Sequence, residues 1–313
     1  MRILVLLNAA GGSAGGTPDR SAEDRIRDAF ASHGVETDIE TVAGSAIATV
    51  AAAFAQSPTH DALAVAGGDG TIGAAAGALA GHAVALGVLP MGTLNHFAKD
   101  LGIPLDLDAA AGVIAAGAER RVDVAEVNGR VFINNSSVGL YPFMVKQRNA
   151  DQKKLGRSKL TATVPAALRT LFSSSSWHRL GIAADGVARR LRTPCVFVGN
   201  NPYEVDLPAF GTRKRLDSGQ LSVHVVRQQT RLGILLLPFK VALGLADPMR
   251  DIEHFTTAEL GITSHAGHLH VSLDGEVASL KTPLRYRIRP GALRVLAPPA
   301  PEKAPEKAPE KAA

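Results

Sequence analysis

Five consecutive residues carry the side-chain types that bind a nucleotide phosphate: Gly67, Gly68, Asp69, Gly70 and Thr71. They follow an apolar run at 61–66 that is typical of a buried parallel strand, and a helix can start at Thr71. A strand, a glycine turn and a helix N-terminus direct unpaired backbone N–H groups at one point, where an anion fits. Asp69 suits the Mg²⁺ that accompanies a nucleoside triphosphate. The alternative is a turn that caps a helix, with Asp69 bonded to local N–H groups.

A second candidate segment follows residues 83–89, an apolar run typical of another buried strand. This strand brings Gly92, Thr93 and Asn95 to the same edge of the sheet. Gly92 allows a ligand to approach the backbone, Thr93 offers a hydroxyl to phosphate or ribose, and Asn95 can donate and accept hydrogen bonds. The alternative is structural: Thr93 caps the next helix and Asn95 holds the loop.

Two carboxylates further along the chain, Asp274 and Glu276, are candidates for proton transfer. Phosphoryl transfer needs a held triphosphate, neutralised charge and a group that activates the acceptor hydroxyl. Residues 268–274 alternate so that Asp274 ends the polar face of a strand, and Glu276 shares that face if the chain stays extended. The pair then supplies a base and a metal-binding or orienting partner. Asp-Gly-Glu also occurs in ordinary hairpins, and which carboxylate takes the proton stays open.

Strands and helices alternate through about residue 120, which predicts an N-terminal α/β nucleotide-binding domain with a mostly parallel sheet. Strand-like segments then predominate, with hairpin signals at Asn128-Gly129 and Asp185-Gly186 and helices at 159–172 and 230–245. This pattern predicts a β-sandwich-like second domain. The predicted strands are 122–126, 130–137, 180–184, 188–199, 219–227, 253–262 and 268–274. Pro-Glu-Lys-Ala repeats predict a disordered tail.

Composition limits the partners and the compartment. The formal charge of +5 fits anionic partners, and aromatic residues at 4% give no support for nucleic-acid binding. A single cysteine, Cys195, excludes an intrachain disulfide and indicates a reducing compartment. The N-terminal apolar run is too brief for a signal peptide, and residues 232–246 are too short to span a bilayer. We expect a cytoplasmic protein. A basic cluster at 146–159 either docks it at the inner membrane face or is an ordinary solvated surface.

The turn at 67–71 and the segment at 90–98 (Pro-Met-Gly-Thr-Leu-Asn-His-Phe-Ala) together resemble the diacylglycerol kinase catalytic-domain family. That family includes bacterial lipid kinases and sphingosine kinases and is related to NAD kinases and, more loosely, phosphofructokinases. His96 stands where its members usually have Asp. The resemblance runs from the first strand to about Pro290. It implies an ATP-binding domain at 1–122, to which residues 285–298 return, a lipid-substrate domain at 123–284 and a tail at 299–313.

The resemblance also assigns roles to individual residues. It implies that Asn8 and the loop after it flank the nucleotide, and that Thr41 contacts it; a helix-start hydroxyl is the alternative for Thr41. It favours the Asp-Gly-Glu segment as the catalytic motif. It places Asp217 in a structural Mg²⁺ site, which we expect to be weak or absent because Ser218 replaces a carboxylate. Asp123, Asn134 and Asn135 also resemble cleft residues, with structural hydrogen bonding as the alternative.

The function expected from these residues and this resemblance is an ATP-dependent lipid kinase. It would transfer the γ-phosphoryl group of Mg-ATP to the hydroxyl of diacylglycerol or a related lipid at the membrane surface. Two alternatives remain. One is an NAD kinase, and the segment from Gly92 to Ala98 argues against it. The other is a catalytically inert nucleotide- or lipid-binding regulatory protein, which the departures at His96 and Ser218 from the family pattern favour. A homodimer is compatible with the sequence.

Overall fold

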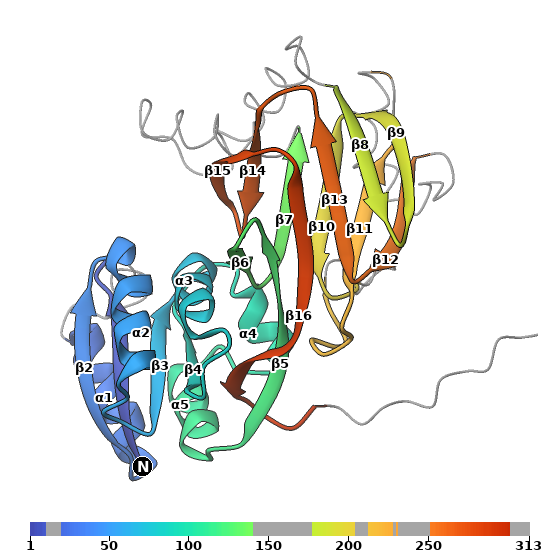
Figure 1. The fold of residues 1–313 in the computed structure, drawn as a ribbon. Helices are drawn as coiled ribbons and strands as arrows, with labels where there is room; N and C mark the ends of the chain where they lie inside the picture. Colours follow the sequence, from blue (N-terminus) through green and yellow to red (C-terminus); the bar gives the residue numbers. More distant parts are fainter. Residues whose placement is uncertain (11–19, 140–176, 204–211, 228–229, 231–250, 301–313) are drawn as a thin grey trace, which may run out of the picture.

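The computed structural model describes residues 1–10, 20–139, 177–203, 212–227, 230 and 251–300 of the 313-residue chain. Figure 1 shows an α/β unit joined to a β-sandwich. The predicted helix at 159–172 and the basic cluster at 146–159 lie outside the described residues. So do the apolar stretch at 232–246, the predicted helix at 230–245 beyond residue 230, and the tail after residue 300. Within the described residues, no helix is both long and apolar enough to cross a membrane.

The α/β unit alternates strands and helices as the sequence predicts. Its strands are β1 (Arg2–Asn8), β2 (Glu36–Val42), β3 (Ala62–Gly67) and β4 (Ala85–Pro90), which pair in parallel in the order β2-β1-β3-β4. Its helices are α1 (Ala22–Ser32), α2 (Ile47–Gln56) after a short 3-10 turn η1 (Gly44–Ala46), α3 (Asp69–Leu79), α4 (His96–Leu101) and α5 (Leu107–Ala115). The carboxyl ends of β1, β3 and β4 therefore meet at one edge, where open α/β sheets bind ligands.

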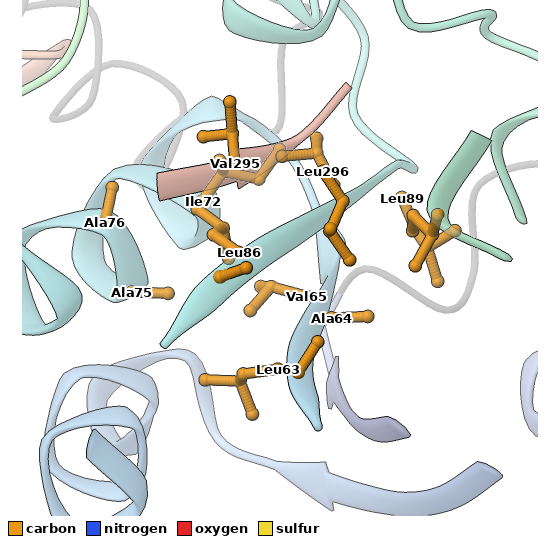
Figure 2. Packing of buried hydrophobic residues seen from close by; sticks show 14 of the residues in the cluster. Leu63, Ala64, Val65, Ile72, Ala75, Ala76, Leu86, Leu89, Val295 and Leu296 are labelled. Atoms are coloured by element: carbon orange, nitrogen blue, oxygen red, sulfur yellow. The ribbon is translucent and has the colours of Figure 1, made fainter. Parts of the chain in front are cut away.

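The two central strands, β3 and β4, are buried along their whole length, because helices cover the sheet. Figure 2 shows Leu63, Val65 and Leu86 of these strands packed with Ile72 of α3. Small residues such as Ala75 and Ala76 let α3 lie close to the sheet. This packing fixes the start of α3 against the ends of β3 and β4.

Helix α3 begins at Asp69, two residues before the predicted start at Thr71. Gly68 is the extended N-cap residue, and its carbonyl accepts hydrogen bonds from the N–H groups of Thr71 and Ile72. Asp69 and Gly70 consequently lie in the first turn of the helix and not in the loop before it.

The second part is a sandwich of two sheets. One sheet continues from the α/β unit in the order β2-β1-β3-β4-β16-β13-β8-β9, with β5 and β6 branching from β16, and the other has the order β12-β11-β10-β7-β14-β15. Their apolar inner faces form a separate core that includes Phe132, Val198, Val271 and Tyr286. The added strands are β5 (Glu119–Val127), β6 (Arg130–Phe132), β7 (Asn135–Gly139), β8 (His178–Ala184), β9 (Val187–Thr193), β10 (Cys195–Asn200), β11 (Leu221–Val226), β12 (Ile252–Thr257), β13 (Glu259–Ser264), β14 (His268–Leu273), β15 (Glu276–Lys281) and β16 (Leu284–Leu296).

Strand β16 connects the two parts. It pairs in parallel with β4 at Arg294–Leu296 and antiparallel with β13 at Leu284–Arg287. Figure 1 shows this long strand, in dark red, running from the sandwich into the α/β sheet. The predicted fold class is confirmed: an α/β unit is followed by a β-sandwich, and the chain returns to the α/β unit near the C-terminus.

Three predicted strands were wrong in their extent, because each is two strands that belong to different sheets. The segment at 130–137 divides into β6 and β7, the segment at 188–199 into β9 and β10, and the segment at 253–262 into β12 and β13. Pro194 marks the second break, since proline has no N–H to donate to a ladder. The first break falls at Ile133 and Asn134, whose backbone N–H groups bond a side chain instead of a strand. Strand β15 was not predicted.

Candidate active site

A cleft of about 900 Å³ opens at the carboxyl edge of the parallel sheet. Most of the predicted nucleotide-binding residues line it, together with Glu276 from the sandwich. Gly67 and Asn95 lie directly behind its wall, whereas Thr41, Asp217 and Asp274 are not part of the lining. The lining residues are Asn8, Ala10, Gly44, Ser45, Ala48, Gly68, Asp69, Gly70, Thr71, Ala74, Met91, Gly92, Thr93, Leu94 and Glu276.

The start of α3 provides free backbone donors at this cleft. The N–H groups of Asp69 and Gly70 precede the first intrahelical bond, and no hydrogen bond from either is found in the part of the chain that the structure describes. The N–H groups of Thr71 and Ile72 are already used by Gly68. Two donors and the positive end of the helix dipole therefore remain for an anion.

Glycine is required where the two loops approach each other. A Cβ atom on Gly92 would lie 2.5 Å from Cα of Gly68, and one on Gly67 would lie 2.7 Å from Cβ of Thr71. Real Cβ atoms do not approach other atoms this closely. These glycines thus shape the wall of the cleft, independently of any ligand.

Two asparagines hold the walls of the cleft. Nδ2 of Asn8 donates to Oγ1 of Thr71 at 2.7 Å, which ties β1 to α3. Asn95 has left-handed backbone angles (φ 51°), and its side chain both accepts from the N–H of Gly92 at 2.9 Å and donates to the carbonyl of Gly92 at 2.9 Å. Asn95 therefore pins the loop, as the structural alternative anticipated, and its amide is committed within the protein.

Asp69 also has a structural contact. Its Oδ1 accepts a hydrogen bond from the backbone N–H of Phe97 at 3.1 Å, which joins α3 to the first turn of α4. Its Oδ2 has no hydrogen bond among the described residues, and Asp69 lines the cleft. One carboxylate oxygen thus remains for a cation. The described residues contain no cluster of three or more His, Cys, Asp or Glu that could hold a metal by themselves.

Asp274 occupies the tight turn between β14 and β15, with left-handed angles at Asp274 (φ 46°) and Gly275 (φ 88°). Its carboxylate accepts three backbone N–H groups: Oδ1 from Asn134 at 2.8 Å and Asn135 at 3.0 Å, and Oδ2 from Ile133 at 2.9 Å. A carboxylate has about four acceptor positions, so one on Oδ2 stays open. Burial of the carboxyl group raises the pKa of Asp274 to about 6, against the opposing effects of the three N–H donors and of Arg213.

Glu276 does not share the position of Asp274, because the chain turns at Gly275 and does not stay extended. Glu276 pairs with Leu273 across the hairpin and is exposed. A Cβ on Gly70 would lie 3.6 Å from Oε1 of Glu276, whereas a Cβ on Gly73 would lie 3.1 Å from Oδ2 of Asp274. The two carboxylates therefore meet successive turns of α3, with Glu276 in the cleft and Asp274 one turn deeper.

Thr41 and Asp217 lie elsewhere. The hydroxyl of Thr41 donates to a carboxylate oxygen of Glu23, and Thr41 is exposed. Asp217 accepts from Nε of Arg215 at 2.8 Å, and this bond lowers its pKa. The hydroxyl of Ser218 donates to Asn201 at 2.6 Å. Neither Thr41 nor Asp217 is brought to the residues of the cleft.

Several residues near the site were given other or no roles by the sequence analysis. Asp123 is buried and accepts the N–H groups of Gly219 and Gly291, a structural role. Gly73 and the ion pair between Arg213 and Asp100 were not singled out. The spacing of Gly70, Gly73 and Gly77 in α3 was a usable signal, because i, i+3 and i+7 share one helix face. The ion pair joins residues 113 positions apart in the sequence, so no pattern of neighbouring residues could predict it.

An α/β unit with a glycine turn is joined here to a sandwich that supplies a carboxylate hairpin, and family models match both parts of this arrangement. Residues 2–127 match the family model described as the diacylglycerol kinase catalytic domain, and residues 144–297 match the YegS C-terminal NAD kinase beta sandwich-like domain. The chain belongs to the diacylglycerol kinase family of lipid kinases, as its two motifs had indicated.

Named relatives agree with this placement. A Pseudomonas syringae pv. tomato protein named "Probable lipid kinase YegS-like" is 30% identical over 289 residues, which are 89% of this chain and 90% of that one. The Bacillus subtilis protein named diacylglycerol kinase is 33% identical over 156 residues, 49% of this chain and 46% of the relative, so this match spans about half of each. A solved Bacillus anthracis str. Sterne structure described as a diacylglycerol kinase has a TM-score of 0.66 at 20% identity, covering 96% of this chain and 97% of that chain. It supports the fold alone.

Proposed function

We propose that the protein is an ATP-dependent lipid kinase that phosphorylates the hydroxyl of diacylglycerol or a related lipid. The observation that carries this proposal is the position of Asp274, held one helical turn from a cleft that has free N–H donors at its floor. A cleft of about 900 Å³ is within the range of pockets that bind small molecules and cofactors. The names of the relatives, lipid kinase and diacylglycerol kinase, support the class of acceptor.

The cleft suits a triphosphate with its cation. The N–H groups of Asp69 and Gly70 would bind phosphate oxygens, and Thr71 and Thr93 also line the cleft. Mg²⁺ is usually held by one or two carboxylates together with substrate phosphates and water. The unbonded oxygen of Asp69 fits that pattern, and the cation would neutralise charge on the transferred phosphoryl group.

The acceptor chemistry is assigned to Asp274. Its open position on Oδ2 takes the proton of the lipid hydroxyl as the hydroxyl oxygen bonds to the γ-phosphorus and the bond from that phosphorus to the β,γ-bridging oxygen breaks, so that ADP leaves. A pKa near 6 leaves this carboxylate ionised at neutral pH yet basic enough to accept a proton. Glu276, exposed at the cleft, orients the acceptor.

The proposal is tested by transfer of label from [γ-³²P]ATP to diacylglycerol and related lipids in mixed micelles, with NAD as a parallel acceptor. Labelled lipid supports the proposal. Labelled NADP with unlabelled lipid would identify an NAD kinase. Folded protein that binds lipid without releasing ADP in any arm would identify a regulatory binding protein.

A further inference from the structure

Arg213 is a buried charge at the junction of the two parts of the chain. Its side chain is 0% exposed and that of its partner Asp100 is 5% exposed. Nε of Arg213 donates to Oδ2 of Asp100 at 2.7 Å, and the backbone N–H of Arg213 donates to Oδ1 at 3.3 Å. The ring of Tyr203 lies 5.3 Å from the guanidinium carbon. A buried charge is tolerated when its hydrogen-bonding groups are satisfied, so the remaining donors identify what this arginine holds.

The remaining donors of Arg213 reach into the sandwich. Nη1 donates to the carbonyls of Ile133 at 2.7 Å and Asn200 at 2.9 Å, and Nη2 donates to Oδ1 of Asn134 at 2.8 Å. Only a planar guanidinium presents several N–H groups in fixed directions, whereas a lysine ammonium cannot serve all these acceptors at once. The guanidinium therefore fixes the position of residues 133 and 134.

The same segment carries the hydrogen bonds that hold Asp274. The N–H groups of residues 133–135 donate to the Asp274 carboxylate, while the carbonyl of Ile133 and the side chain of Asn134 are bonded to Arg213. The segment is thus held between Arg213 and Asp274. This arrangement also explains why the strand predicted at 130–137 is interrupted there.

Asp100 links this segment to the nucleotide cleft. It lies on α4, whose first-turn N–H at Phe97 is bonded to Asp69 and whose N-cap residue is Asn95. A continuous set of contacts therefore runs from Asp69 through α4 and the ion pair to the segment that holds Asp274. Apart from helix α4 itself, each contact along it is a hydrogen bond of 2.7–3.1 Å.

We propose that Arg213, anchored by Asp100, is a positioning residue for phosphoryl transfer: it fixes residues 133–135 so that the Asp274 carboxylate stands at a set place beside the cleft. Arg213 contacts neither the cleft nor the Asp274 carboxylate through any of its hydrogen bonds, and it acts through the backbone segment between them. This inference rests on the proposed lipid kinase function.

The test is the variant Arg213→Lys, made in the full chain. This substitution keeps the positive charge and removes the planar guanidinium with its fixed N–H directions. We expect kcat for lipid phosphorylation to fall about 10-fold or more, because small displacements of a reacting group are costly. KM for ATP should stay within about twofold, because the cleft itself is untouched. Arg189→Lys, in the ion pair with Glu253 on the sandwich, is the matched control and should leave both constants unchanged. Wild-type kcat in folded Arg213→Lys would overturn the proposal.

A second readout does not depend on activity. Hydrogen exchange of the amides at 133–135, measured by mass spectrometry, should accelerate in Arg213→Lys and stay at the wild-type rate in Arg189→Lys. If Arg213→Lys does not fold, the double variant Arg213→Met/Asp100→Leu removes both charges together and leaves no unpaired buried ion. Wild-type exchange in a folded variant overturns the positioning role. Absence of lipid labelling by the wild type overturns the proposed function, and the exchange rates still decide whether Arg213 holds the segment.

Discussion

Gly73 and Asp274 face each other across the junction between α3 and the sandwich, and a methyl group would fit between them only if the carboxylate moved by a few tenths of an ångström. A Cβ on Gly73 would lie 3.1 Å from Oδ2 of Asp274, and the carboxylate cannot withdraw freely because three backbone N–H groups hold it. The absence of one side chain in the helix thus determines how close the proposed base lies to the start of α3, which lines the cleft.

Gly73→Ala should therefore uncouple activity from stability. We expect kcat to fall on the order of 10²-fold, since the base is displaced. Helix propensity favours alanine by roughly 0.5–1 kcal/mol, which offsets part of the strain, so Tm should change little. Gly77→Ala is the control, because its Cβ would lie 3.5 Å from Cβ of Val131, an ordinary contact. Equal activity of the two variants would contradict the assignment.

Asp274→Asn and Glu276→Gln should distinguish the two carboxylates. The proton acceptor must be ionised, so kcat/KM of the wild type should rise with pH through about 6, the pKa of Asp274. Asp274→Asn should lose on the order of 10²–10⁴-fold in kcat and should lack this dependence. Glu276→Gln should retain it with a smaller loss. A pH profile that disappears in Glu276→Gln alone would assign the base to Glu276.

Asp69→Asn tests the cation role apart from the structural role. The amide oxygen of asparagine can still accept from the N–H of Phe97, so the contact between α3 and α4 should survive. The charge on the free oxygen is lost, and we expect a loss of activity on the order of 10²-fold with a higher Mg²⁺ requirement. The control is Asp106→Asn, at the N-cap of α5, where the side chain accepts from Ala109. Unchanged Mg²⁺ dependence in Asp69→Asn would argue against a cation at this residue.

Gly92→Ala should damage the cleft itself. The added Cβ would lie 2.5 Å from Cα of Gly68 and 2.8 Å from Oδ1 of Asn95, so backbone must move. Overpacking of this kind costs about 1–3 kcal/mol, and Tm and ATP binding should both fall. Gly267→Ala, where nothing lies within 4 Å of the added atom, should match the wild type in thermal melting and in calorimetric ATP titration. Intact ATP binding in Gly92→Ala would show that the two loops need not touch.

His224 should make stability depend on pH, far from the cleft. Its ring stacks on His254 at 4.5 Å, and burial lowers the pKa of His224 to about 4. In the unfolded chain this histidine binds a proton below about pH 6.5, whereas in the folded protein it stays neutral until the pH approaches about 4. The neutral, buried ring therefore contributes to the free energy of unfolding above pH 6.5, and this contribution is lost as the pH falls toward 4. His224→Phe should flatten Tm over this range, and His82→Phe, at an exposed position, should not. An unchanged slope in His224→Phe would refute the prediction.

The sequence predicted what depends on local patterns. The apolar runs at 61–66 and 83–89, with the glycine turn, predicted where the cleft lies. The Asn-Gly and Asp-Gly pairs predicted two hairpins. Each of these features is encoded by adjacent residues. The turn at Asp274-Gly275 belongs to the same class, with positive φ at both positions. Extending the chain through it was wrong, and that error placed Asp274 and Glu276 on one face.

Contacts between distant segments could not be predicted. The break in the strand at 130–137 depends on a carboxylate about 140 positions later, at Asp274, and on the guanidinium of Arg213. Nothing in residues 130–137 alone distinguishes them from one continuous strand. The structural contact of Asp69 with Phe97 was equally invisible, although both residues lie in segments that had been singled out.

Strand β16 occupies an interior place in the first sheet although it comes late in the chain, between β4 and the sandwich strands. During synthesis, β4 emerges some two hundred residues before its neighbour and has an open edge until residues 284–296 leave the ribosome. The sheet of the α/β unit is therefore completed only by a strand from the far end of the chain. A product truncated before residue 284 leaves the edge of β4 without this partner, and exposed strand edges favour pairing with other chains.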